Sequence, residues 1–124
     1  MFHALARNCA DMMIGASKPT RSRHAWAEVY RSLAHGAAKA ACEDRKIVGR
    51  FPNEIADFAI FFAEMQSKRH AADYSPEGKF YKSAVKADIE RAEKVIKDFG
   101  TATAKDRRAF ASWVLFRHVT NRNR

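Results

Sequence analysis

The stretch NEIADFAIFFAEMQSKR, residues 53–69, decides the fold class of this chain. Its intervals of three and four residues between apolar side chains are those of one face of an α-helix. Ile60 and Phe61 add a second apolar face, which is typical of a helix at the centre of a bundle or at a contact between subunits. These two residues are therefore candidate dimer contacts. The main stripe consists of Ile55, Phe58, Phe62 and Met65, continued by Arg69.

The rest of the chain also has helical periodicity, and no segment alternates with the period of two that strands show. Ser22 is the expected N-cap of one helix, and Thr103 with Asp106 has the spacing of a capping box at the start of the last helix. The prediction is an all-α bundle of about five helices. Besides the central helix, the expected helices cover residues 2–14, about 22–43, about 80–99 and the segment that begins after Thr103.

One domain covering residues 1–124 is expected, because 124 residues of which 47% are hydrophobic suffice for a single core. The apolar pattern is already under way at Phe2 with no capping residue before it, which suggests that an upstream N-terminal helix is missing. In the helix expected at 80–99, five residues are predicted to face the core. They are Val85, Ile89, Ala92, Ile96 and Phe99.

The chain is strongly basic, with 23 Lys and Arg residues against 14 Asp and Glu residues and a net charge of +9. The first 50 residues contribute +5, the next 50 contribute −1 and the last 24 contribute +5. An excess of this size favours a polyanionic partner such as RNA. Arg117, Arg122 and Arg124 belong to a basic tail, for which we expect either contact with phosphates or simple solvation.

Composition excludes several classes of protein. No apolar run is long enough to span a membrane, and the N-terminus lacks the pattern of a secretory signal. Cys9 and Cys42 belong to no CxxC or Cys/His cluster, so neither a disulfide framework nor a zinc site is expected. We therefore expect a cytoplasmic protein with no metal and no cofactor.

The densest polar cluster follows the most apolar helix, at KRHAADYSP, residues 68–76. Arg69 and Asp73 are four residues apart, as are His70 and Tyr74, so two pairs can form across one helical turn. A catalytic interpretation lets Arg69 hold a phosphate while His70 or Tyr74 moves a proton. A structural interpretation makes Arg69 and Asp73 a clasp. The residues leave both interpretations open.

A second polar group contains His35 and Arg31, on the polar side of the helix expected at 22–43. These side chains form either a solvated face or, with Asp73, part of a polar pocket. The other histidines have no metal-ligand spacing, and the sequence contains no glycine-rich phosphate loop and no nucleophile elbow.

Three stretches together resemble a group of uncharacterised bacterial HEPN-like proteins. They are FHALAR at residues 2–7, VYRSLAHG at residues 29–36 and QSKRHAADYSP at residues 66–76. The resemblance covers nearly the whole chain and is most specific at RHAADY, residues 69–74. It implies a helical bundle that forms a homodimer and acts near RNA. Many such proteins are metal-independent ribonucleases of toxin–antitoxin or defence systems, whereas others have lost catalysis.

The active members of this group carry an Arg followed, after four to six residues, by a His. In this chain Tyr74, Ser75 and Pro76 occupy the corresponding positions after Arg69. The first hypothesis is therefore a binding and dimerisation domain that engages RNA or a cognate protein without catalysis. The second is a divergent metal-independent ribonuclease, and the third is an antitoxin-like or scaffold protein.

Overall fold

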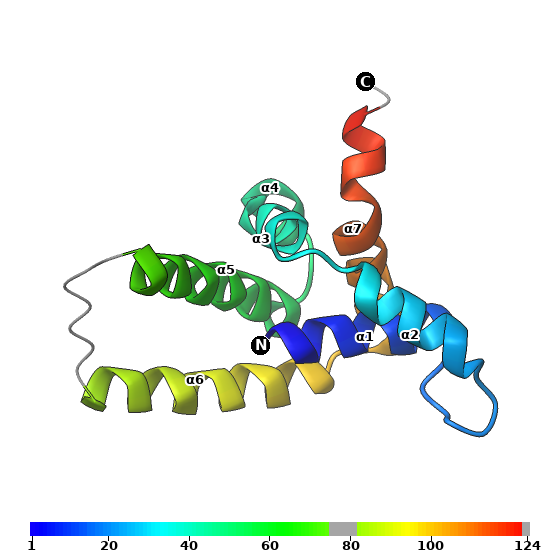
Figure 1. Ribbon diagram of the computed structural model, residues 1–124, viewed down its shortest axis with the longest axis horizontal. Coiled ribbons are helices and arrows are strands. Elements are labelled where there is room, and N and C mark those ends of the chain that lie inside the picture. The colour runs from blue at the N-terminus through cyan, green and yellow to red at the C-terminus, as the bar shows by residue number, and fades with distance from the viewer. Residues whose placement is uncertain (75–81, 123–124) are drawn as a thin grey trace.

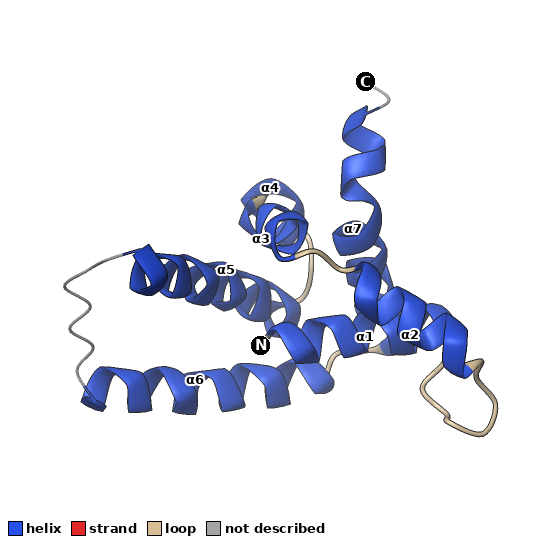
Figure 2. Ribbon diagram, viewed as in Figure 1, coloured by secondary structure: helices blue, strands red, loops and turns tan. Residues whose placement is uncertain are grey.

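The computed structural model describes residues 1–74 and 82–122, with side chains described for residues 1–71 and 84–117. Over these residues the chain is entirely helical and contains no strand (Figure 2), so the all-α prediction is confirmed. The described residues form seven helices rather than about five. They are α1 (Phe2–Ile14), α2 (Arg23–Ser32), α3 (His35–Glu43), α4 (Arg45–Val48), α5 (Asn53–Tyr74), α6 (Lys82–Gly100) and α7 (Ala104–Arg122).

The prediction of a single helix at about 22–43 is wrong, because the chain leaves helical geometry at Leu33 and Ala34. Both residues have extended backbone, with ψ angles of 115° and 138°. The Leu33 side chain is buried in the core. The break lets α2 pack against α1 while α3 packs against α5 and α7. The second additional helix, α4, is a single turn whose N-terminus is capped by the Asp44 carboxylate.

The core forms around the first half of α5, as its apolar stripe predicts. Phe58 is fully buried, with its ring centroid 4.4 Å from that of Phe99 and 6.4 Å from that of Phe110. Phe61 is fully buried as well, and the Arg91 guanidinium lies 4.4 Å from its ring centroid. Phe61 therefore belongs to the core of its own chain rather than to an exposed subunit contact.

The helices divide into two regions (Figure 1). In one, α1 packs against α2 and against α7. In the other, α5 and α6 lie side by side and extend away from α7. Helix α3 lies between the regions and contacts both α5 and α7, and the Trp113 indole donates a hydrogen bond of 3.1 Å to the Ala41 carbonyl. Segments far apart in the sequence thus meet at α1 and α7.

Candidate functional site

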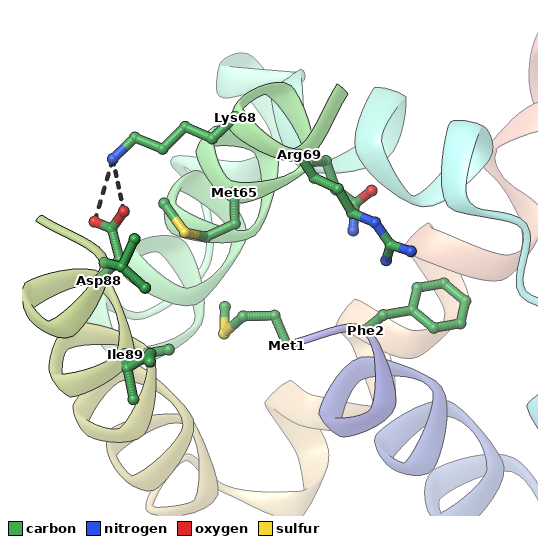
Figure 3. Close-up of a pocket in the computed structure, with 10 residues that line it drawn as sticks. Met1, Phe2, Met65, Lys68, Arg69, Asp88 and Ile89 are labelled. Atoms are coloured by element: carbon green, nitrogen blue, oxygen red, sulfur yellow. Dashed lines mark hydrogen bonds and ion pairs between the residues drawn. The ribbon is translucent and has the colours of Figure 1, made fainter. Parts of the chain in front are cut away.

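A groove opens between the second half of α5 and the first half of α6, beside the first residues of α1 (Figure 3). Its volume is about 430 Å³, which is within the range of ligand pockets in proteins. Most of its wall is apolar. The apolar wall residues are Met1, Phe2, Met65, Val85, Ile89 and Ala92.

The apolar stripe of α6 is only partly buried, which corrects the prediction that all of it faces the core. Phe99 is 5% exposed, whereas Val85 is 42% exposed and Ile89 is 55% exposed. The stripe therefore starts in the core and continues into the open groove. Burying such side chains is favourable by about 25 cal/mol per Å² of apolar surface. Covering this part of α6 with another apolar surface would therefore be favourable.

Charged groups stand at the rim of the groove. The Lys68 ammonium bonds both carboxylate oxygens of Asp88, at 3.2 and 3.0 Å, and so links α5 to α6. Arg69 lies next to Lys68, and its side chain extends toward Phe2 (Figure 3). Across residues 1–71 and 84–117, no hydrogen bond or ion pair joins Arg69 to another residue. Its guanidinium is thus available to an anionic group from outside.

The other residues of the predicted polar cluster are placed as follows. His70 is exposed on α5, directly after Arg69. Asp73 and Tyr74 form the end of α5, but their side chains lie outside the described residues, as do Ser75 and Pro76 altogether. The clasp between Arg69 and Asp73 therefore stays a prediction.

His35 and Arg31 are separated by the break between α2 and α3. The His35 ring stacks on Phe2, with a centroid distance of 3.7 Å and an interplanar angle of 11°. Phe2 in turn shares the groove wall with Arg69. Arg31 stays exposed in the last turn of α2. Local sequence patterns could not predict the stack between His35 and Phe2, because the contact joins residues that are 33 positions apart.

A second candidate site is formed where the start of α7 packs against α1. The Arg108 Nε atom donates a hydrogen bond of 3.4 Å to the Met12 carbonyl, and Arg21 donates to the Gly15 carbonyl at 3.3 Å. Helix α1 has no basic residue in its own last turn, so these two arginines supply the cations that the negative end of its dipole favours. The segment before α2 and the start of α7 are thereby fixed to the same helix end.

The segments that meet in this region belong to the most basic parts of the sequence. Residues 1–32 and 101–124 together contain 11 Lys and Arg residues against 3 Asp and Glu residues, a net +8 of the total +9. We call the exposed cations around the end of α1 the basic face. Its residues are Lys18, Arg23, Lys105 and Arg108.

Of the three arginines expected in a basic tail, Arg117 is the one whose side chain lies within the described residues. Helix α7 runs to Arg122, so Arg117 lies well inside a helix. The Arg117 guanidinium pairs with Asp44 at 3.9 Å and lies 5.5 Å from the centroid of the Trp113 ring. The Arg122 side chain and the whole of Arg124 lie outside the described residues.

The described side chains offer no cluster of three or more His, Cys, Asp or Glu residues that could hold a metal ion. The two cysteines are buried, and burial is the main cause that raises the pKa of each thiol to about 12. They are unreactive side chains of the core rather than nucleophiles. None of the helices, over the residues described, is long and apolar enough to cross a membrane.

Comparison with known proteins found no match to this chain among protein families, curated proteins or solved structures.

Proposed function

We propose that this chain is a HEPN-like helical domain that binds RNA through the basic face and does not cleave it. One observation carries the proposal: hydrogen bonds from Arg108 and Arg21 to the end of α1 bring the exposed cations of the basic face together from two distant parts of the sequence. The resemblance of residues 2–7, 29–36 and 66–76 to HEPN-like proteins supports RNA as the polyanion. The proposal includes a homodimer, for which the half-buried Ile60 is the candidate contact.

Binding by such a face follows from counterion release. Each phosphate neutralised by a Lys or Arg releases condensed ions, so affinity for a single strand falls with salt by a logarithmic slope of about −0.7 per phosphate. Four exposed cations predict a slope of about −3. Structural ion pairs of the fold do not contribute, because their charges are already neutralised within the chain.

The test is fluorescence anisotropy of a labelled 20-nucleotide mixed-sequence RNA in EDTA, over a series of salt concentrations. The variant Arg23→Glu/Lys105→Glu reverses two cations of the basic face, neither of which is paired within the described chain. The control Lys86→Glu/Lys94→Glu makes the same change in net charge on exposed positions of α6. We expect at least tenfold weaker binding and a shallower salt slope for the first variant, and less than a threefold change for the control. Equal losses in both variants would overturn the proposal.

A divergent ribonuclease is the second candidate, and the Arg69 guanidinium at the groove favours it, because it has no partner among the described side chains. In this mechanism Arg69 holds a phosphate, and His70 or Tyr74 transfers the proton. The measurement is a gel of the same RNA after incubation in EDTA. Cleavage by the parent and by Arg50→Ala, an exposed control, but not by folded Arg69→Ala would replace the binding proposal by catalysis. Intact RNA in all three samples would leave binding as the function.

A further inference from the structure

The two walls of the α5–α6 groove share one spacing. On α5 the residues facing this side are Phe58, Phe62, Met65 and Arg69, at intervals of four, three and four. On α6 they are Val85, Ile89, Ala92, Ile96 and Phe99, at intervals of four, three, four and three. Such alternation is the heptad spacing by which helices pack knobs into holes. Each stripe begins in the core and continues past its edge.

The outer half of this helix pair has apolar side chains that no other described helix covers. Helix α5 is the main packing partner of α6, and beyond the core Ile89 remains 55% exposed. Figure 3 shows Met1, Met65 and Ile89 directed into the same space between the ribbons. A helix placed there would continue, outside the core, the packing that the buried halves of both stripes already make within it.

The charge at the groove identifies the chemistry of the occupant. Arg69 occupies a heptad position, where a charged side chain requires a partner when it is covered. Asp88 is the one acidic residue among the described residues of the groove wall, and Lys68 already holds both of its oxygens. A second copy of this chain would therefore bring another Arg69, which has no partner among the described side chains, and no free carboxylate from the described part of this surface.

We propose that the α5–α6 groove docks an amphipathic helix of a different protein, with apolar residues at heptad spacing and one Asp or Glu placed against Arg69. The occupied groove covers Val85 and Ile89, and the carboxylate forms a charge-assisted pair with the guanidinium. Because the basic face lies at α1 and α7, this inference does not depend on RNA binding.

The probe is a fluorescein-labelled 21-residue helical peptide with Leu at its heptad positions, except for one central Glu. Three matched peptides serve as controls: one with Arg in place of that Glu, one with Gln, and a scrambled peptide of the same composition. Binding is measured by anisotropy with the full chain and with variants shown by circular dichroism to be folded. We expect saturable binding of the Glu peptide, and binding at least fivefold weaker for the Gln, Arg and scrambled peptides.

Two pairs of protein variants locate the site. Ile89→Ala should weaken binding at least fivefold, whereas Phe116→Ala, which removes an aromatic side chain that is 47% exposed outside the groove, should leave it unchanged. Arg69→Glu should weaken binding of the Glu peptide and restore binding of the Arg peptide. Arg50→Glu, at another exposed position, should change neither. Unspecific attraction to a basic protein would not restore binding of the Arg peptide to the Arg69→Glu variant.

Three results would overturn the inference. One is the absence of saturable binding by the Glu peptide. Another is equal affinity for the Glu and scrambled peptides, which would indicate unspecific charge attraction. The third is sedimentation that shows a dimer of the parent chain and a monomer of Ile89→Ala, since a second copy would then be the occupant. Loss of RNA binding in the basic-face variant with unchanged peptide binding would separate the two proposals.

Discussion

Asp11 joins the end of α1 to the start of α2 through one carboxylate. Its Oδ1 atom accepts hydrogen bonds from the Trp26 indole at 2.9 Å and from Arg21 at 3.1 Å. The Arg21 guanidinium also lies 4.4 Å from the centroid of the Trp26 ring. The three side chains shape the turn that carries Lys18 and Arg23 of the basic face.

The variant Asp11→Ala should lower the free energy of unfolding by roughly 2 kcal/mol, because it leaves two donors, one of them charged, without their acceptor. Asp57→Ala removes an exposed carboxylate on α5 with no recorded partner in the described chain, and should cost less than about 0.5 kcal/mol. Urea unfolding followed by circular dichroism compares the two. Equal stabilities would show that the carboxylate contributes little to the turn.

The two buried thiols should make the folded protein less stable at alkaline pH. Burial raises the pKa of Cys9 from 9.0 to about 12, and burial, with smaller contributions from the charges of Cys9 and Glu43, does the same for Cys42. Between these values the unfolded chain loses protons that the folded chain keeps, so ionisation favours unfolding. Stability is fully present below about pH 9 and should fall by roughly 1 kcal/mol per pH unit for each thiol above it.

Urea titrations from pH 8 to 11 measure this fall, and the double variant Cys9→Ser/Cys42→Ser should lose less stability over that interval. At pH 8 a thiol reagent should modify neither cysteine of the folded protein and both cysteines in urea. Rapid labelling of the native chain would show instead that the two thiols are reached by local opening.

At the level of the helix, Thr103 controls the start of α7. The Asp106 backbone N–H donates to the Thr103 hydroxyl at 3.2 Å, and that hydroxyl donates to the Asp106 carboxylate at 2.9 Å. This confirms the cap that the sequence predicts. The first turn of α7 carries Lys105 and Arg108, so the cap also orders half of the basic face.

Thr103→Ala should therefore cost about 1 kcal/mol of stability and weaken RNA binding, because the first turn of α7 frays. Thr103→Ser keeps a hydroxyl and should leave both quantities close to those of the parent. Thermal unfolding and RNA anisotropy provide the two measurements. A loss of stability without any loss of RNA binding would place the phosphate contacts outside this turn.

The helices differ in how well the sequence foretells them. Helix α5 and the cap of α7 follow from local patterns, because a helical stripe and a capping box involve residues only three or four apart. The break at Leu33 carries no such mark, since the apolar period continues through it and neither Gly nor Pro occupies the position. Its cause is tertiary: α2 and α3 pack against different helices.

The same distinction holds for the candidate sites. The position of Arg69 on the stripe of α5 follows from spacing alone, and the structure has it at the groove wall. The exposure of Val85 and Ile89 could not be predicted from spacing. Spacing indicates which residues share a face of a helix but not whether another helix covers that face. The basic face could not be predicted from local patterns either, because its residues come from distant parts of the sequence.

At the scale of the whole molecule, stability should decrease along the α5–α6 pair from the core outward. Five side chains of residues 55–63 are fully buried, whereas the outer part depends on exposed ion pairs such as Lys68 with Asp88 and Arg91 with Glu64. Exposed ion pairs each contribute only about 0–1 kcal/mol. Amide hydrogen exchange followed by mass spectrometry should thus be faster at 64–71 and 84–91 than at 55–63.

A helix docked in the groove should change this pattern of amide exchange. Addition of the Glu peptide should slow exchange at 64–71 and 84–91 while leaving the second half of α1 and α7 unchanged, because the third helix covers only the groove. Uniform protection along α5 in the absence of peptide would contradict the prediction and indicate that the pair opens as a single unit.

The two surfaces also differ in when they can first exist during synthesis. The pair of α5 and α6 forms from neighbouring helices, whereas the hydrogen bond from Asn8 to the Arg107 carbonyl closes a separation of 99 residues. At a translation rate of about 5–20 residues per second, α7 emerges from the ribosome several seconds after α5. The nascent chain can therefore engage a partner helix before its basic face is complete, so the order of assembly is set by the order of synthesis.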